Sequence, residues 1–114
     1  MDMIGKYVPI ETKKLTGRVY LDEIIYVEKA LRKTILVTEK EKIALYCDMG
    51  FIKAYTDDRF LDCHRSYLFN MDKIKQMTEQ TVVLENGDSI PLGRDCFRAG
   101  RKVYRNYLHK KKKE

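Results

Sequence analysis

Short apolar stretches alternate with polar residues along most of the chain, and turn residues separate them. Alternation with a period of two is typical of β-strands that bury one face. In the first half of the chain this pattern predicts five strands, near residues 6–11, 17–21, 24–28, 33–39 and 42–47.

The segment DMGFIKAYTDD (48–58) has a helical pattern instead. Asp48 suits the N-cap position, and Phe51, Ile52 and Tyr55 fall on one helical face. A short inner helix is therefore expected here.

Apolar and aromatic residues then run through FLDCHRSYLF (60–69), which predicts one extended segment. A turn is expected at NMDK (70–73), with Asn70 as its cap, and residues 74–92 are interpreted as strands around turns. The Asn86-Gly87 pair predicts a hairpin, because both residues tolerate the positive φ of a type I′ turn.

The C-terminal segment RDCFRAGRKVYRNYLHKKKK (94–113) predicts a helix with a partly periodic apolar stripe and arginines between its members. Gly100 weakens this helix without ending it. The elements together predict one mostly-β domain over residues 1–114, with a short inner helix and a basic C-terminal helix. Residues 1–4 and 109–114 are expected to be frayed tails.

The length of 114 residues fits a single domain. No apolar run approaches the ~18 residues that a membrane helix needs. The N-terminus lacks the apolar region of a signal peptide, so a cytoplasmic protein is expected. The three cysteines are widely spaced and odd in number, unlike a secreted disulfide framework.

The positive charge is concentrated at the C-terminal end. From Arg94 onward nine Lys or Arg residues stand against two acids, a net charge of +7, while the first 93 residues have 14 bases and 15 acids. Such a block favours a polyanion, either nucleic acid or an acidic membrane surface. A solvated helix face followed by a frayed tail is the alternative.

The Cys-His-Arg-Ser core of residues 63–66 allows three chemical interpretations: a catalytic cluster, a metal site or a contact surface for an anion. Neighbouring strand residues point to opposite faces, so Cys63 and His64 could not form the hydrogen bond that activates a thiol. Zinc sites need paired ligands at close spacing, which scattered cysteines and two distant histidines do not offer. Neither an enzyme nor a metal or cofactor site is expected.

Contact with an anion fits these residues better. Arginine presents a planar fork of donors that matches phosphate or a guanine edge. His64 and Ser66, on either side of Arg65, could add hydrogen bonds to phosphate oxygens. The alternative is a structural ion pair of Arg65 with Asp62 or Asp72.

Several segments, in order, resemble the LytTR family of DNA-binding domains. FLDCHRSYLFNMDKI (60–74) resembles the family signature, with His-Arg-Ser followed by Asn and Ile. DEIIYVE (22–28) matches an early strand motif, and Asn86-Gly87 before Ile90-Pro91-Leu92 matches a late hairpin. Arg94 falls on the family's Ser-Arg position, although Gly93 stands where serine is usual, so one phosphate contact there is in doubt.

The resemblance implies a fold of small antiparallel sheets and a role in bacterial transcription regulation. Family members are usually output domains of response regulators in two-component systems. They bind promoter DNA as dimers on repeated sites, with loop side chains entering successive major grooves. The chain has no receiver domain, so it is either a stand-alone protein or a fragment of a longer regulator.

The resemblance also implies DNA contacts by position. One of Arg32 and Lys33 would read bases from the loop between the early strands, and Arg65 would do so from the signature. The full set of expected DNA-binding residues is Arg32, Lys33, His64, Arg65, Ser66, Asn70, Arg94 and Arg98.

Two other functions remain open. One is a LytTR-like protein-interaction module that has lost DNA binding. The other is a non-specific polyanion binder acting through the basic C-terminal tail. In the main interpretation the partners are double-stranded promoter DNA and a second copy of the chain, with no membrane and no small-molecule substrate.

Overall fold

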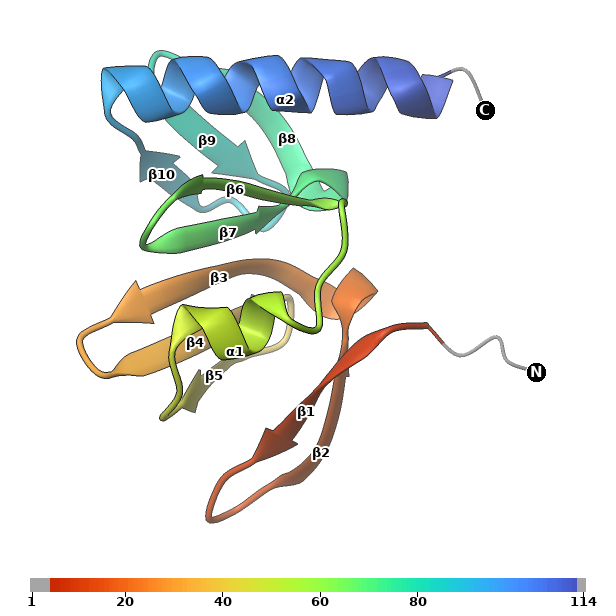
Figure 1. The fold of residues 1–114 in the computed structure, drawn as a ribbon, viewed down its shortest axis with the longest axis vertical. Helices are drawn as coiled ribbons and strands as arrows, with labels where there is room; N and C mark the ends of the chain where they lie inside the picture. Colours follow the sequence, from red (N-terminus) through yellow and green to blue (C-terminus); the bar gives the residue numbers. More distant parts are fainter. Residues whose placement is uncertain (1–4, 113–114) are drawn as a thin grey trace.

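Strands dominate the fold (Figure 1). The computed structural model describes residues 5–112, with side chains described through Lys110. The described part holds three antiparallel sheets, and the predicted class is confirmed: mostly β, with a short inner helix and a C-terminal helix. In chain order the elements are β1 (Tyr7–Glu11), β2 (Thr16–Tyr20), η1 (Leu21–Glu23), β3 (Ile24–Ala30), β4 (Lys33–Thr38), β5 (Lys42–Leu45), α1 (Met49–Lys53), β6 (Phe60–His64), β7 (Tyr67–Asn70), η2 (Met71–Lys73), β8 (Ile74–Thr78), β9 (Thr81–Leu84), β10 (Ser89–Pro91) and α2 (Arg94–Lys112).

The central sheet has the strand order β5-β4-β3-β7-β6, and its inner strands β4, β3 and β7 bury residues on both faces. Successive residues of a strand point to opposite faces, so neighbours in sequence enter different cores. Leu36 and Leu68 belong to the first core, whereas Val37 and Phe69 belong to the second. The sheet is thus a rigid partition between two layers.

The first core lies between this sheet and the layer formed by the β1–β2 hairpin and α1. Val8 and Ile10 from the hairpin and Ile52 from α1 are almost fully buried there. Asp48 caps α1 as predicted, because its Oδ1 accepts a hydrogen bond from the Phe51 N–H at 2.9 Å. The predicted apolar face is wrong in part: Phe51 stays 43% exposed, since a helix of five residues has room for only one buried side.

The second core lies between the central sheet and a layer made of β10-β9-β8 and α2 (Figure 1). Gly100 is buried where α2 crosses β6, and a Cβ there would lie 2.9 Å from the Cys63 Sγ. Glycine therefore lets the helix approach the sheet more closely than any other residue would. The Tyr104 hydroxyl also donates to the Ile74 carbonyl at 2.9 Å and holds the helix to β8.

The predicted extended segment over 60–69 is wrong, because the chain reverses at Arg65 and Ser66 and forms the β6–β7 hairpin. Glycine or asparagine usually marks such a turn, and neither is present. Here the His64 Nδ1 accepts a hydrogen bond from the Ser66 N–H at 3.0 Å, which stabilises the reversal.

The predicted late hairpin forms as β9 and β10, but its turn is not of type I′. Gly87 has a φ of 97°, whereas Asn86 has no positive φ. The Asn86 Oδ1 instead accepts from the Asp88 N–H at 3.0 Å, a local bond that competes with the type I′ geometry. Positive φ at two successive residues occurs at Glu79 and Gln80, in the turn between β8 and β9.

The expected frayed tails are partly corrected. Helix α2 continues to Lys112, so residues 109–112 are helical and are not a tail. Residues 1–4 and 113–114 lie outside the described residues.

Candidate nucleic-acid interface

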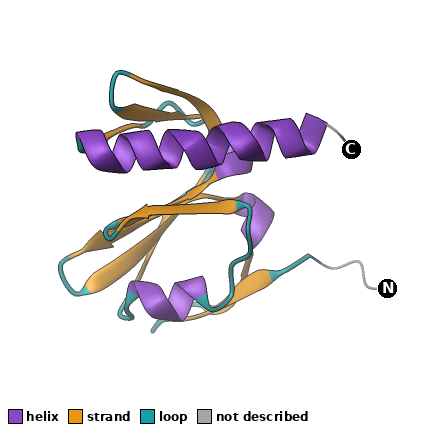
Figure 2. Ribbon diagram, turned by 45° about the horizontal axis from the view of Figure 1, so that its top comes forward, coloured by secondary structure: helices purple, strands orange, loops and turns teal. Residues whose placement is uncertain are grey.

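Three segments meet at one end of the central sheet. The β3–β4 turn, the β6–β7 turn and the start of α2 follow one another along the left edge of Figure 1, and Figure 2 shows them on the same side. The Lys29 N–H donates to the Ser66 carbonyl at 2.8 Å and ties the first two turns together. We call this set of segments, residues 29–33, 64–67 and 93–98, the turn face.

Arg65 lies at the centre of the turn face and is exposed. The two acids considered as its partners are engaged elsewhere: Asp62 pairs with Lys53 at 3.0 Å, and Asp72 accepts a hydrogen bond from the Tyr107 hydroxyl at 2.7 Å. Within residues 5–110 no acidic side chain forms an ion pair with Arg65. Its guanidinium is thus exposed on a backbone held by hydrogen bonds of the neighbouring Ser66.

His64 supports the turn from within. Its ring is half-buried, lies 5.3 Å from the Tyr67 ring and accepts the Ser66 N–H at Nδ1. Because Nδ1 is used by the backbone, Nε2 is the nitrogen left to donate to a phosphate. Ser66 is half-buried beside it, and its backbone groups bond to Lys29 and His64.

Arg32 and Lys33 are neighbours at the β3–β4 turn, but their side chains lie in different surroundings. Arg32 lies in the turn itself and is exposed, whereas Lys33 is the first residue of β4. The Lys33 Nζ lies 5.2 Å from the centre of the Tyr46 ring, a cation–π contact that directs it toward β5. Of the two, Arg32 is the better placed for a ligand in front of the turn.

Arg94 and Arg98 lie on the first turns of α2 and are exposed. Arg94 approaches Asp95 at 3.8 Å, but the two side chains are 77% and 91% exposed. Such an exposed pair contributes little and does not hold the arginine away from a stronger anion. Both arginines are therefore available at the turn face.

Asn70 does not belong to this face, in contrast to the prediction. Its side chain is fully buried, and its Nδ2 donates to the carbonyls of Leu21 at 3.2 Å and Ile24 at 2.8 Å. Its Oδ1 accepts from the Asp72 N–H at 2.9 Å, which confirms the predicted cap of the NMDK turn. Since these bonds occupy the amide, Asn70 has a structural role and is left out of the contacts proposed below.

Two residues that the sequence reasoning missed complete the turn face. Lys29 and Leu31 line a hollow of about 330 Å³ together with Arg65 and Ser66. Lys29 could have been found from the strand alternation, because it follows half-buried Glu28 and points outward near the turn. The sequence does not show the hydrogen bond from the Lys29 N–H to the Ser66 carbonyl that joins this turn to the Arg65 turn.

Burial makes Cys63 a poor candidate nucleophile, because it raises the pKa of the thiol to about 11. A thiol that stays protonated at neutral pH does not react as a thiolate. Among residues 5–112 no group of three or more metal-ligating side chains comes together. Neither of the α-helices described is long and apolar enough to span a membrane.

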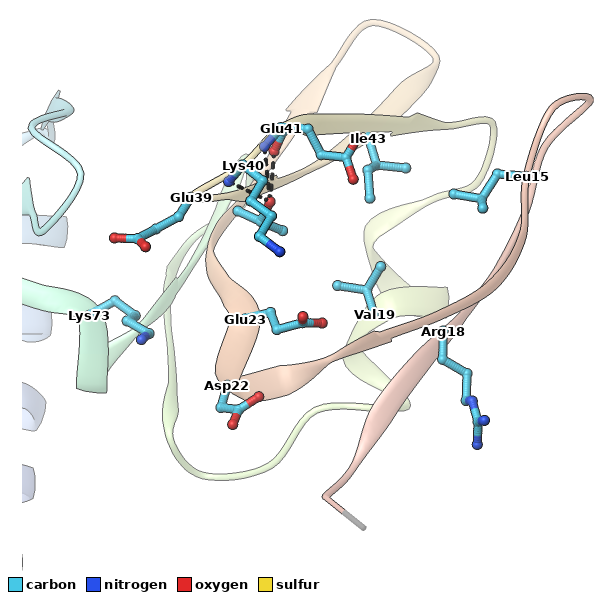
Figure 3. A pocket seen from close by; sticks show the side chains of 11 residues that line it. Leu15, Arg18, Val19, Asp22, Glu23, Glu39, Lys40, Glu41, Ile43 and Lys73 are labelled. Carbon is cyan, nitrogen blue, oxygen red and sulfur yellow. Dashed lines mark hydrogen bonds between the residues drawn. The ribbon is translucent and has the colours of Figure 1, made fainter.

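A second hollow, of about 440 Å³, lies between the β1–β2 hairpin and the β4–β5 turn (Figure 3). Both acids and bases line it, among them Asp22, Glu23, Glu41, Arg18 and Lys40. Glu23 is already used, since its carboxylate accepts the Tyr20 N–H at 2.9 Å. None of the expected site residues lines this hollow, and its mixed charge does not favour a polyanion.

Comparisons with known proteins agree with this geometry. The family model of the LytTr DNA-binding domain matches residues 16–104. Among solved structures, the fold is similar to the LytTr DNA-binding domain of a Bacillus cereus protein described as a methyl-accepting/DNA response regulator. That match has a TM-score of 0.71 at 24% identity, and it covers 86% of this chain and 95% of the other. A search of curated proteins found no match.

Proposed function

The chain belongs to the LytTR family of DNA-binding domains, so its function lies in DNA binding for transcription regulation, and we propose that it recognises specific double-stranded promoter sequences through the turn face. Arg65 would read base edges in one major groove, because its fork matches the acceptors of guanine. Arg32 and Arg94 would contact bases or phosphates on either side of it. Catalysis has no part in this proposal.

One observation carries the proposal: Arg65 is exposed and without an ion pair in residues 5–110, yet its backbone is tightly held. The Ser66 N–H bonds to His64, and the Ser66 carbonyl bonds to Lys29 on the neighbouring strand. A preorganised arginine loses less entropy on binding than a mobile one.

The charge of the turn face supports a polyanion as the ligand. Lys29, Arg32, Arg65, Arg94 and Arg98 are all exposed, and among the side chains of residues 5–110 the only acid paired with any of them is Asp95. Each phosphate neutralised by one of these side chains releases a counterion, so affinity should fall steeply with salt.

Further features of the proposal rest on the family alone. The chain would act in bacterial cytoplasm, as a homodimer on repeated half-sites, within two-component signalling. Two copies on successive half-sites would place two turn faces on the same side of the duplex, about one helical turn apart.

A non-specific polyanion binder is the second candidate, and one observation favours it. On α2, Arg98, Arg101, Lys102 and Arg105 are exposed, and none forms an ion pair with a described acid. This basic helix could hold any duplex through phosphates. The protein-interaction alternative is less favoured. An acidic contact surface would support it, whereas the turn face is basic.

Selection of bound duplexes from a random DNA library at near-physiological salt, with Arg65→Ala alongside, tests the proposal. We expect enrichment of a pair of repeated half-sites by the natural protein and loss of that enrichment in the variant. Retention without an enriched motif, abolished when Arg101, Lys102 and Arg105 are replaced by glutamine and residues 109–114 are deleted but not by Arg65→Ala, would instead support the non-specific binder.

A further inference from the structure

Leu31 has an unusual position at the tip of the β3–β4 hairpin. It is 94% exposed and has a φ of 59°. Bulky L-residues rarely adopt the left-handed region, because the Cβ crowds the backbone. Hairpins with a two-residue turn prefer glycine or asparagine where φ is positive.

Leucine at this position gives the fold no evident benefit. Its side chain has almost no contact that would remove it from water, so it gains no hydrophobic stabilisation. Glycine or asparagine would relieve the strain and interact better with solvent. An exposed apolar residue held in a strained conformation is better explained by a ligand than by folding.

The surroundings of Leu31 indicate which ligand. Leu31 lines a hollow together with Lys29, Arg65 and Ser66, and a bond from the Lys29 N–H to the Ser66 carbonyl joins two of these residues. Leu31 is thus an exposed apolar group beside donors suited to phosphates and base edges. On the base edges of a DNA major groove, the apolar group is the C5-methyl of thymine.

We propose that Leu31 is a specificity-determining residue that packs against a thymine methyl group in the major groove next to the site of Arg65. The inference rests on the proposed function and deepens it, because it adds a preference for thymine beside the position that Arg65 reads. The wide major groove admits a two-stranded β-ribbon, so the hairpin tip can reach the base edges there.

Removal of the methyl group from the DNA tests the contact without altering the protein. The duplex from the library selection is synthesised with deoxyuridine in place of thymidine at one position at a time. We expect one such replacement to weaken binding of the natural protein about fourfold, equivalent to ~0.8 kcal/mol for one buried methyl group.

The variant Leu31→Asn completes a double-mutant cycle. It should bind the thymidine duplex about fourfold more weakly and no longer distinguish thymidine from deoxyuridine at that position. Its melting temperature should equal or exceed that of the natural protein, which separates the effect from misfolding. Leu15→Asn, the same substitution at the half-exposed leucine between β1 and β2, is the matched control and should leave both affinities unchanged.

Two results would overturn the inference about Leu31 and leave the proposed function intact. One is an enriched site at which every replacement by deoxyuridine is silent. The other is a Leu31→Asn variant that still discriminates thymidine from deoxyuridine. A natural protein that selects no DNA sequence would instead overturn both, and it would do so in the selection, before any variant is compared.

Discussion

The two ends of the β6–β7 hairpin carry polar residues from one sequence motif, and the structure uses them in opposite ways. Asn70 at the base is fully buried and makes three hydrogen bonds to backbone groups. Arg65 at the tip is exposed, and the described acids leave it unpaired. Five positions therefore separate a residue that holds the fold from an exposed one for which we propose contact with DNA.

This difference shows how a small domain can present a rigid binding surface on short turns. The base of the hairpin is fixed by Asn70, which links β7 to the Leu21 and Ile24 carbonyls. The tip is fixed by bonds of the Ser66 backbone to His64 and Lys29. The hydrogen bonds that hold the backbone at both ends do not involve the Arg65 side chain. This side chain is therefore not needed to hold the hairpin.

The largest expected effect is a loss of stability on substitution of Asn70 at the base of the β6–β7 hairpin. Asn70→Ala would remove the amide that bonds the Leu21 and Ile24 carbonyls and the Asp72 N–H, and the Leu21 carbonyl would keep only its bond from the Ile24 N–H. The free energy of unfolding should therefore fall by ~2–4 kcal/mol. Urea unfolding followed by circular dichroism measures it. The control is Asn106→Ala on the exposed side of α2, which should change stability little. Equal effects at both positions would show that the base of the hairpin is not specially held.

The next largest effect is a loss of DNA affinity on substitution of Arg65 at the tip of the β6–β7 hairpin. Arg65→Ala should weaken specific DNA binding by ~1–3 kcal/mol and leave the free energy of unfolding unchanged, because its guanidinium forms no ion pair in residues 5–110. Fluorescence anisotropy with the selected duplex measures the affinity.

Arg59→Ala is the matched control for Arg65. Arg59 donates to both carboxylate oxygens of Asp57, at 2.9 and 3.0 Å. Its loss should lower stability and spare DNA specificity, the reverse of the Arg65 result. If Arg65→Ala destabilised the protein as much as Arg59→Ala, Arg65 would have a structural role, and its proposed contrast with Asn70 would be wrong.

The strands and both helices could be predicted from the sequence because alternation and helical spacing are local properties. The Arg65 turn could not, since His64 supplies the hydrogen bond that a glycine or asparagine turn would not need. Asn70 was predicted both as a turn cap and as a DNA contact. Only the long-range bonds to Leu21 and Ile24 show that its amide is already occupied.

The arginines of the candidate surface could be predicted from the resemblance, but the bonds that hold its turns together could not. Resemblance to a family placed Arg65 and Arg94 in the expected list. The bond between Lys29 and Ser66, which joins two turns far apart in sequence, depends on the order of strands in the central sheet. Leu31 was missed because its positive φ and exposure are properties of the folded backbone.

A smaller effect is expected where α2 supports the β6 strand behind the tip. Gly100→Ala should lower stability by about 1 kcal/mol, because the crowding at the Cys63 Sγ outweighs the gain in helix propensity. Thermal unfolding measures the change.

In a Cys63→Ala background the same Gly100→Ala substitution should lose its cost, since the sulfur atom has been removed. A cost that persists unchanged in that background would show that crowding at Cys63 is not its cause.

The smallest effect concerns Arg98, which we assign to phosphate rather than to bases. Arg98→Gln should weaken binding to all DNA sequences about equally and reduce the slope of log affinity against log salt by about one. Titrations at several salt concentrations, on the selected duplex and on a scrambled one, measure both quantities. A loss confined to the selected duplex would move Arg98 into the group that reads bases.

The most direct test of the central claim is a titration of isotope-labelled protein with the selected duplex, followed by amide chemical shifts in NMR. We predict that the largest changes cluster at residues 29–33, 64–67 and 93–98, while the amides around Asn70 and the first core change little. Changes concentrated along residues 101–110 of α2, with the Arg65 turn silent, would contradict the account and make the basic helix the DNA-binding element.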